Sequence, residues 1–150
     1  MVPNCTRRRE TRREEPMSQI ERIHSDQVGE PPAETWSNCL RVGNQVFIAG
    51  MTARSAEFDQ IDGAGAYEQA RVIFTKIKHL IEAAGGTMAD VVKVNVFVTE
   101  IGQRQEVWRA RREFFTGNFP VSTLVEVSAL ALPDMEVEVE AVAILGAGTS

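Results

Sequence analysis

Hydrophobic and polar residues alternate along residues 135–145, MEVEVEAVAIL. A period of two predicts a β-strand with one buried face. The residues predicted to be buried are Val137, Val139, Ala141 and Ala143. The opposite face carries three carboxylates in a row, Glu136, Glu138 and Glu140. Such a row is either solvated or lines a site, so the remaining elements have to be placed before the two can be distinguished.

Apolar periodicity elsewhere predicts the other elements. Strands are expected over residues 19–25, 39–42, 46–49, 89–99, 122–130 and 135–145, and helices over about 66–84 and 102–115. Gly43 and Asn44 form the turn of a hairpin between the second and third strands. The order β-β-β-α-β-α-β-β predicts an α+β fold in two layers, with both helices on one face of a mixed sheet.

The face of the sheet without helices is predicted to carry apolar side chains. They are Val142 and Ile144 on the last strand, and Val91 and Phe97 on the 89–99 strand, whose inner face would carry Val92, Val94, Val96 and Val98. A single chain would leave this apolar face in water, which is unfavourable. We therefore expect a homo-oligomer in which copies cover one another and sites lie at their seams.

Composition and charge indicate the domain organisation. A chain of 150 residues suits one domain. Residues 1–16 are charged and poor in large apolar residues, so we expect a disordered extension before a domain at 17–150, with Met17 as the natural start. The net charge is +2 in residues 1–16 and −7 in the rest. An acidic body argues against nucleic-acid binding.

The chain has no apolar run long enough for a membrane span and no visible secretory signal. Of its two cysteines, Cys5 lies in the polar extension, so a structural disulfide is not expected and Cys39 is interpreted as a packed core residue. These features favour a cytoplasmic protein without membrane partners.

Common cofactor and metal motifs are missing from the sequence. Gly63 and Gly65 in GAGAYE lack the third glycine and the preceding strand of a dinucleotide site, and His24 and His79 are far apart. We therefore expect no cofactor and no metal. Carboxylates, small polar residues and loop glycines remain, and such a set can orient a water molecule and bind a small polar compound.

Four segments together resemble the RidA/YjgF family, also described as endoribonuclease L-PSP. They are NCLRVGNQVFIAGMTA, AAGGTMADVVKVNVFVTE, EVWRARREFF and FPVSTLVEVSALALPDMEVEVEAVAI, and the resemblance covers roughly residues 20–146. It implies a chorismate-mutase-like α+β fold and a homotrimer with clefts between subunits. It also implies metal-free hydrolysis of reactive enamines or imines to 2-oxo acids and ammonia.

The resemblance also implies roles for particular residues. Glu138 corresponds to the carboxylate that holds the attacking water, and Gly50 to a glycine that lines the cleft. Trp36 stands in place of a cleft tyrosine, and Trp108 lies near the position of a helix asparagine. Ser122 occupies the position of the arginine that binds the substrate carboxylate.

Serine at position 122 leaves the expected pocket short of a positive anchor. Arginine grips a carboxylate with two charged hydrogen bonds, whereas serine offers one neutral hydroxyl, and losing such a partner costs on the order of 2–5 kcal/mol. Arg41, Arg54 or Arg111 remain candidates to supply the charge.

Two hypotheses follow. The first is an enamine or imine deaminase with non-standard specificity, in which Trp36 and Trp108 favour a larger or less charged substrate. The alternative is a non-catalytic trimeric module that binds a small metabolite or a protein. A ribonuclease is disfavoured by the acidic body.

Overall fold

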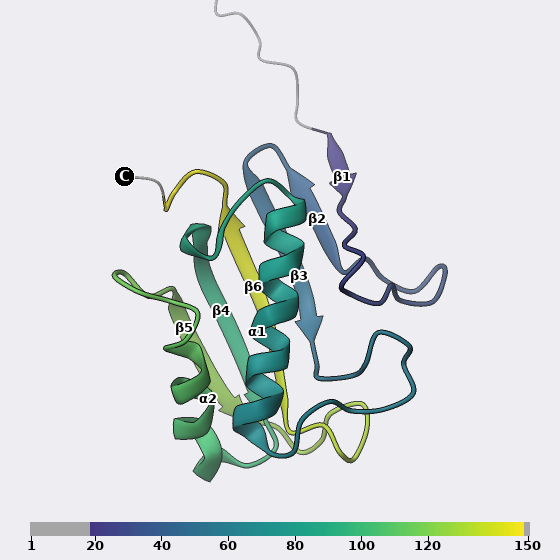
Figure 1. The fold of residues 1–150 in the computed structure, drawn as a ribbon, viewed down its shortest axis with the longest axis vertical. Helices are drawn as coiled ribbons and strands as arrows, with labels where there is room; N and C mark the ends of the chain where they lie inside the picture. Colours follow the sequence, from purple (N-terminus) through teal and green to yellow (C-terminus); the bar gives the residue numbers. More distant parts are fainter. Residues whose placement is uncertain (1–18, 149–150) are drawn as a thin grey trace, which may run out of the picture.

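The computed structural model describes residues 19–148, so the expectations for residues 1–16 and Met17 lie outside the described residues. The α+β prediction is confirmed, with both helices packed on one face of a six-stranded mixed sheet (Figure 1). The strands are β1 (Ile20–Arg22), β2 (Cys39–Val42), β3 (Gln45–Met51), β4 (Val91–Val98), β5 (Val121–Glu126) and β6 (Val137–Ile144). The helices are α1 (Ala66–Ala83) and α2 (Arg104–Arg111), with short 3₁₀ turns at Met88–Asp90 and Ile101–Gln103.

The sheet order β1-β2-β3-β6-β4-β5 places the last strand in the middle of the sheet. β6 pairs antiparallel with both β3 and β4, while β5 pairs parallel to β4 at the edge. The predicted alternation of β6 is confirmed, because its odd-numbered residues are buried and its even-numbered residues are half-buried. β6 therefore displays Glu138 and Glu140 from the centre of the sheet.

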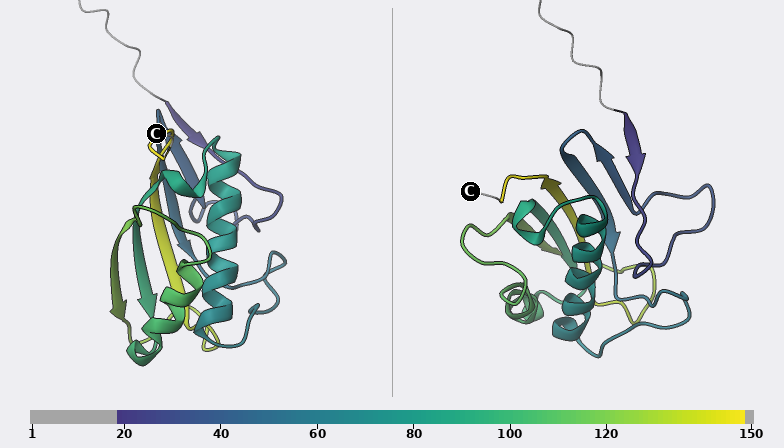
Figure 2. Two further views of the ribbon diagram at one scale, coloured as in Figure 1. Left: turned by 60° about the vertical axis from the view of Figure 1, so that its left-hand side comes forward. Right: turned by 45° about the horizontal axis from the view of Figure 1, so that its top comes forward.

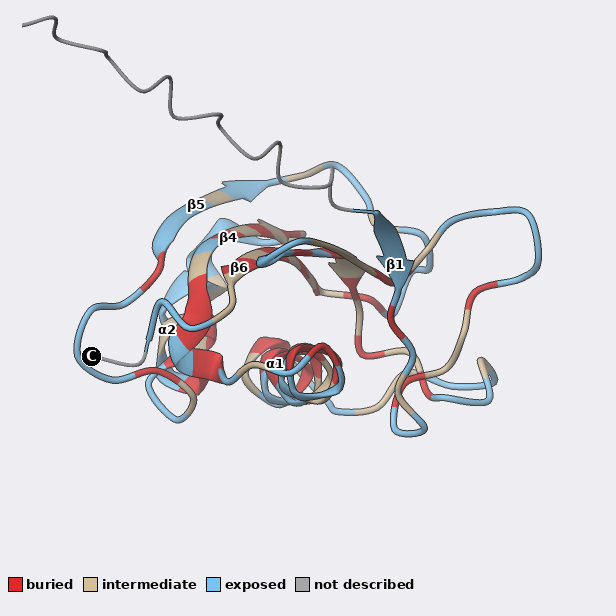
Figure 3. Cartoon of the chain, turned by 90° about the horizontal axis from the view of Figure 1, so that it is seen from above, coloured by how far each residue is buried: buried red, intermediate tan, exposed pale blue. Residues whose placement is uncertain are grey.

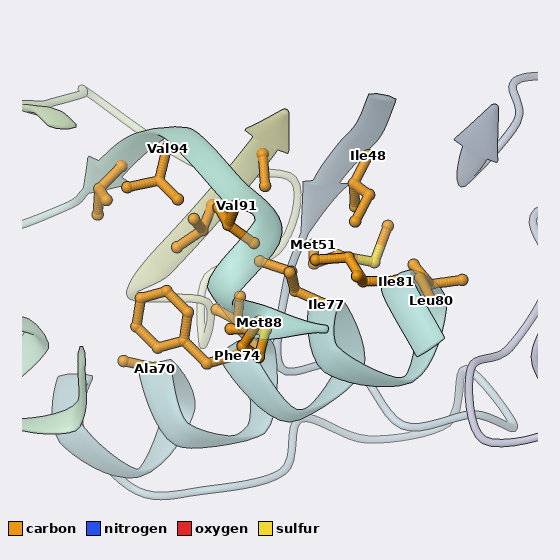
Figure 4. Close-up of a cluster of buried hydrophobic side chains, with 14 of the residues drawn as sticks. Ile48, Met51, Ala70, Phe74, Ile77, Leu80, Ile81, Met88, Val91 and Val94 are labelled. Carbon is orange, nitrogen blue, oxygen red and sulfur yellow. The ribbon is translucent and has the colours of Figure 1, made fainter. Parts of the chain in front are cut away.

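The core lies between the sheet and the two helices (Figure 2). α1 supplies a fully buried stripe that includes Ile73, Phe74 and Ile77, and the helix packs against β6 and β3. Figure 4 shows Phe74 and Ile77 within this cluster of buried side chains. The ring of Phe74 also contacts Phe114 and Phe115, which follow α2, at centroid distances of 5.5 and 5.7 Å. This cluster fastens the end of the second helix to the first.

The start of β4 differs from the prediction. Val91 was expected on the helix-free face, but it is 4% exposed and lies in the core, while Val92 is half-buried (Figure 4). The cause is a shift in the pairing of β4 with β6 between Val91 and Lys93, typical of a β-bulge. Because an extra residue inverts the alternation, the strand has its expected faces only from Val94 onward.

The helix-free face of the sheet does carry exposed apolar side chains. Figure 3 shows that the edge strand β5 is mostly exposed, whereas β6 in the middle of the sheet is not. Phe47 is 43% exposed and stands opposite Val142, and Val125 on the edge strand is 42% exposed. Within residues 19–148, neither helix combines the length and the apolar character that a bilayer crossing demands.

Candidate functional site

A cavity of about 370 Å³ lies where the end of β3 meets the loops on either side of the β2–β3 hairpin. α1 contributes Lys76 to its wall and β6 contributes Glu138. The polar and aromatic residues around it are Trp36, Asn38, Thr52, Arg54, Ser55, Phe58, Lys76 and Glu138. Three of the five residues predicted for the site, Trp36, Gly50 and Glu138, therefore line one cavity.

Glu138 lies directly against the backbone of Gly50. A Cβ atom built on Gly50 would come within 2.0 Å of Glu138 Oε1 and within 2.9 Å of its Cδ. Pairing between β3 and β6 is irregular between Ile48 and Met51, and Gly50 lies within that interval. The missing side chain is therefore what allows the carboxylate to reach its position, as expected for a glycine at a close approach.

The environment of Glu138 disfavours its charge. Burial, and secondly the neighbouring carboxylate of Glu140, raise the pKa of Glu138 above its usual range. Glu140 accepts a 2.8 Å hydrogen bond from Asn95 Nδ2, and Glu138 has no such partner among residues 19–148. A half-buried carboxyl group with a raised pKa can accept a proton from water and return it later in a reaction.

The other two glutamates, Glu136 and Glu140, are half-buried, and each has a hydrogen-bond partner in its own chain. The buried side-chain amide of Gln69 on α1 makes two hydrogen bonds with Glu136. Its Oε1 accepts from the backbone N–H of Glu136 at 2.9 Å, and its Nε2 donates to Glu136 Oε2 at 3.4 Å. Of the three glutamates, the one that lines the cavity is Glu138.

Trp36 is held at the cavity by a buried amide. Its indole Nε1 donates to Asn38 Oδ1 at 3.2 Å, and Asn38 Nδ2 donates to the carbonyl of Gly29 at 2.9 Å. Asn38 is only 5% exposed. The sequence reasoning missed Asn38, because a single asparagine before a strand carries no periodic signal.

Two cations line the cavity, Arg54 and Lys76, and Arg54 is one of the three arginines considered as a replacement for the missing charge at position 122. Arg54 donates through Nε and Nη2 to the carbonyl of Phe58, at 3.3 and 3.0 Å. Lys76 Nζ donates to the carbonyls of Thr52, at 2.7 Å, and Arg54. Burial lowers the pKa of Lys76. Lys76 was not anticipated, because a lysine at the border of an apolar helix stripe ordinarily extends its ammonium group to solvent.

The remaining candidate arginines lie elsewhere. Arg41 is tied to the carbonyls of Gly43 and Ala84, at 2.9 and 3.1 Å. Arg111 on α2 is 9% exposed, and within residues 19–148 its Nε and Nη2 atoms have no hydrogen-bond partner. Burial lowers the pKa of Arg111.

Trp108 and Ser122 do not line this cavity. Trp108 is half-buried on α2, with the Arg104 guanidinium 5.9 Å from the centre of its ring. Ser122 is exposed on the edge strand β5 in register with Val94, which is buried beneath the helices. Residues in register on adjacent strands share a face, so Ser122 lies on the helix-bearing side of the sheet.

Cysteine and metal chemistry receive no support from the geometry. Cys39 is fully buried, as its interpretation as a core residue requires, and burial raises its pKa to about 11. Within residues 19–148, no three His, Cys, Asp or Glu side chains are grouped so that they could hold a metal ion.

Comparison with known proteins agrees with the fold. The sequence model of a family described as Endoribonuclease L-PSP matches residues 28–145. A 2-iminobutanoate/2-iminopropanoate deaminase of Dermatophagoides farinae is 29% identical over 124 residues, which are 83% of this chain and 96% of that protein. The structure of RidA from an Antarctic Psychrobacter is 30% identical, with a TM-score of 0.75 and coverage of 83% of this chain and 99% of the other.

A second solved structure is more similar in sequence. It is a Pseudomonas aeruginosa protein described as of unknown function, 42% identical with a TM-score of 0.78, and the match covers 87% of this chain and 95% of the other.

Proposed function

Because the chain belongs to the endoribonuclease L-PSP family, also called RidA/YjgF, we propose that it hydrolyses an imine or enamine in the cavity around Glu138. The observation that carries the proposal is the position of this carboxyl group. Glu138 is half-buried, has a raised pKa and rests on Gly50 at the wall of a cavity that suits a small molecule.

The reaction needs one water molecule and one proton carrier. Glu138 accepts a hydrogen bond from water and takes its proton as the oxygen attacks the carbon of the C=N bond. Glu138 returns that proton to the nitrogen, which gives a neutral carbinolamine. It then takes the hydroxyl proton of the carbinolamine and delivers it to the nitrogen as the C–N bond breaks, so that ammonia and a carbonyl group are released and the carboxylate is regenerated. An acid with a pKa nearer neutrality serves both steps, because it is a better base before the attack and a usable acid after it. Trp36 forms an aromatic wall beside the substrate.

Ser122 gives the proposed enzyme a non-standard way of recognising its substrate, because the carboxylate contact that an arginine at this position would make has to come from another residue. A serine hydroxyl cannot form the paired, charged hydrogen bonds that a guanidinium makes with a carboxylate. Ser122 and Trp108 are outside the cavity of the single chain, so any contact they make with substrate comes from a second copy.

We further propose a cytoplasmic homotrimer, with the small-molecule ligand at the subunit interfaces and without nucleic-acid or membrane partners. The exposed Phe47 and Val125 on the helix-free face support this assembly. Light scattering after size exclusion should give about three times the 16.6 kDa chain mass, and Phe47→Asp should dissociate the complex. A wild-type mass of one chain would contradict it.

The test of the activity is ammonia release from imines generated in situ, with the competing spontaneous hydrolysis subtracted. Glu138→Ala should lower the rate by about 10²–10⁴-fold, which is the range for loss of a general acid–base group. Glu82→Ala, on the exposed surface of α1, is the matched control and should retain full rate. If no imine is converted faster than in buffer, the proposal is wrong.

The alternative is a non-catalytic module that binds a small metabolite or a protein, and the serine at position 122 favours it. It predicts a ligand that raises the melting temperature and is recovered unchanged. If no compound in a broad metabolite screen shifts the melting temperature, the alternative fails.

A further inference from the structure

We propose that Arg54 binds the carboxylate of the substrate, so that the cavity accepts anionic 2-imino acids although residue 122 is serine. This inference rests on the proposed hydrolysis, because it names the substrate class of the same site. It also assigns to one of the three candidate arginines a role that the sequence left open.

The guanidinium of Arg54 is fixed before any ligand arrives. Nε and Nη2 both donate to the Phe58 carbonyl, and the guanidinium carbon lies 4.9 Å from the centre of the Phe58 ring. These contacts hold one edge and one face of the planar group. The edge formed by Nη1 and the second Nη2 hydrogen stays available, and that edge suits a bidentate carboxylate.

Hydrogen bonds of the Ser55 side chain stabilise the turn that presents the Phe58 carbonyl. Ser55 is 5% exposed, and its Oγ donates to Asp59 Oδ1 at 2.7 Å and accepts from the backbone N–H groups of Asp59 and Gln60. Phe58 has a φ of 61°, in the left-handed region that a bulky residue rarely adopts. Strained backbone of this kind persists where the surroundings fix it, and it is common at ligand-binding sites.

Lys76 fastens the other end of the same segment. Its ammonium group donates to the backbone carbonyls of Thr52 and Arg54, so α1 anchors the loop at the residue that carries the guanidinium. Lys76 also adds a second positive charge to the cavity wall. We therefore assign Lys76 a positioning role and Arg54 the contact with substrate.

No internal anion neutralises Arg54. Within residues 19–148, no carboxylate oxygen lies within ion-pairing distance of its guanidinium, although Arg22, Arg71 and Arg109 each have such a partner. Glu138 on β6 also lines the cavity without a hydrogen-bond partner in the same part of the chain. A 2-imino acid carries its carboxylate next to the C=N carbon, so it fits a site with an anion anchor and a water-holding group.

Arg41 and Arg111 do not fit this role. Arg41 already donates to two carbonyls at the hairpin and at the end of α1, and Arg111 does not line the cavity. Arg54 lines the cavity, and its contacts within residues 19–148 leave one edge of its guanidinium without a partner.

The experiment compares Arg54→Gln with Arg54→Lys and uses Arg112→Gln, an exposed arginine after α2, as the matched control. KM and kcat are measured with 2-iminobutanoate, and the binding of 2-oxobutanoate and of its uncharged amide is measured by calorimetry. We expect Arg54→Gln to raise KM and weaken 2-oxobutanoate binding by about 30-fold or more, with kcat changed less than threefold. Amide binding should not change, and Arg54→Lys should recover part of the loss.

The outcomes separate this inference from the proposed hydrolysis. If the wild type hydrolyses 2-iminobutanoate and Arg54→Gln does so with an unchanged KM, the role of Arg54 is wrong while the hydrolysis stands. If nothing is hydrolysed but 2-oxobutanoate binding depends on Arg54, the anion site stands and the hydrolysis fails. If acid and amide lose affinity equally in a folded Arg54→Gln variant, the loss is structural and the inference is overturned.

Discussion

Replacing Gly50 by alanine should separate the position of Glu138 from the stability of the fold. The new Cβ would lie 2.0 Å from Glu138 Oε1, whereas ordinary contacts begin at 3.4 Å, so the oxygen must move by about 1.4 Å. A displacement of about 1 Å at a reacting centre can cost on the order of 10²-fold in rate, or about 2.7 kcal/mol. We therefore expect Gly50→Ala to lower kcat by about 10²-fold.

Stability should change little in the same variant. The three atoms nearest to the added Cβ all belong to the Glu138 side chain, which can rotate, and not to the backbone. Alanine also lowers the entropy of the unfolded chain, which favours folding by about 0.4–1 kcal/mol. The melting temperature should thus stay within a few degrees of the wild type. Gly102→Ala, where nothing lies within 4 Å of the added atom, should keep the full kcat and gain only the same small entropic stabilisation.

A double-mutant cycle completes the design. If Gly50→Ala acts only by displacing the carboxylate, it should lower the rate of wild type but not of Glu138→Ala. Displacement of the carboxylate is ruled out as the cause if Gly50→Ala keeps the full rate, or if it lowers the rate of Glu138→Ala by the same factor as that of wild type.

Three further predictions concern buried ionisable groups. Because folding raises the pKa of Glu138, ionisation of this group destabilises the folded state as the pH rises through the unfolded and then the folded pKa. Glu138→Gln should therefore have a higher melting temperature than wild type at pH 8 but not near pH 4. An equal difference at both pH values would contradict this. Arg111→Met removes two buried donor atoms that have no hydrogen-bond partner within residues 19–148 and that cost about 1–3 kcal/mol each, so it should raise the melting temperature, whereas a fall would mean that Arg111 meets an anion from another copy. Cys39, with a pKa of about 11, should carry about one thiolate in ten thousand at pH 7 and resist iodoacetamide until the protein is unfolded, as peptide-resolved mass spectrometry can verify.

The fold was largely predictable because its strongest sequence signals coincide with its central elements. β6 lies mid-sheet with helices over one face, so its alternation is sharp, and α1 carries a long apolar stripe. The face of Val91 was not predictable, because a bulge adds one residue to a run in which valines occur at both parities. α2 is shorter than predicted, since its last turn tightens and Phe114 N bonds the Arg111 carbonyl three residues back.

The site was predictable only in part. Glu138 lies on a predicted strand and Gly50 directly follows one, but their close approach results from the pairing of β3 with β6, which no local pattern gives. The position of Arg54 depends on the left-handed backbone of Phe58 and on the contact of Lys76 with the Arg54 carbonyl. Neither feature produces a periodic pattern in the sequence. The partners of Glu136 and Glu140 were missed for the same reason, because Gln69 and Asn95 come from distant parts of the chain.

The position of Trp36 gives the protein an optical reporter. The chain has two tryptophans, and Trp36 stands at the cavity with half of its surface in solvent while Trp108 lies on α2. In a Trp108→Phe variant, the indole emission would arise from the cavity wall alone. Its intensity and wavelength would then follow the entry and departure of compounds that do not absorb light themselves, and a stopped-flow instrument could time those events without any label.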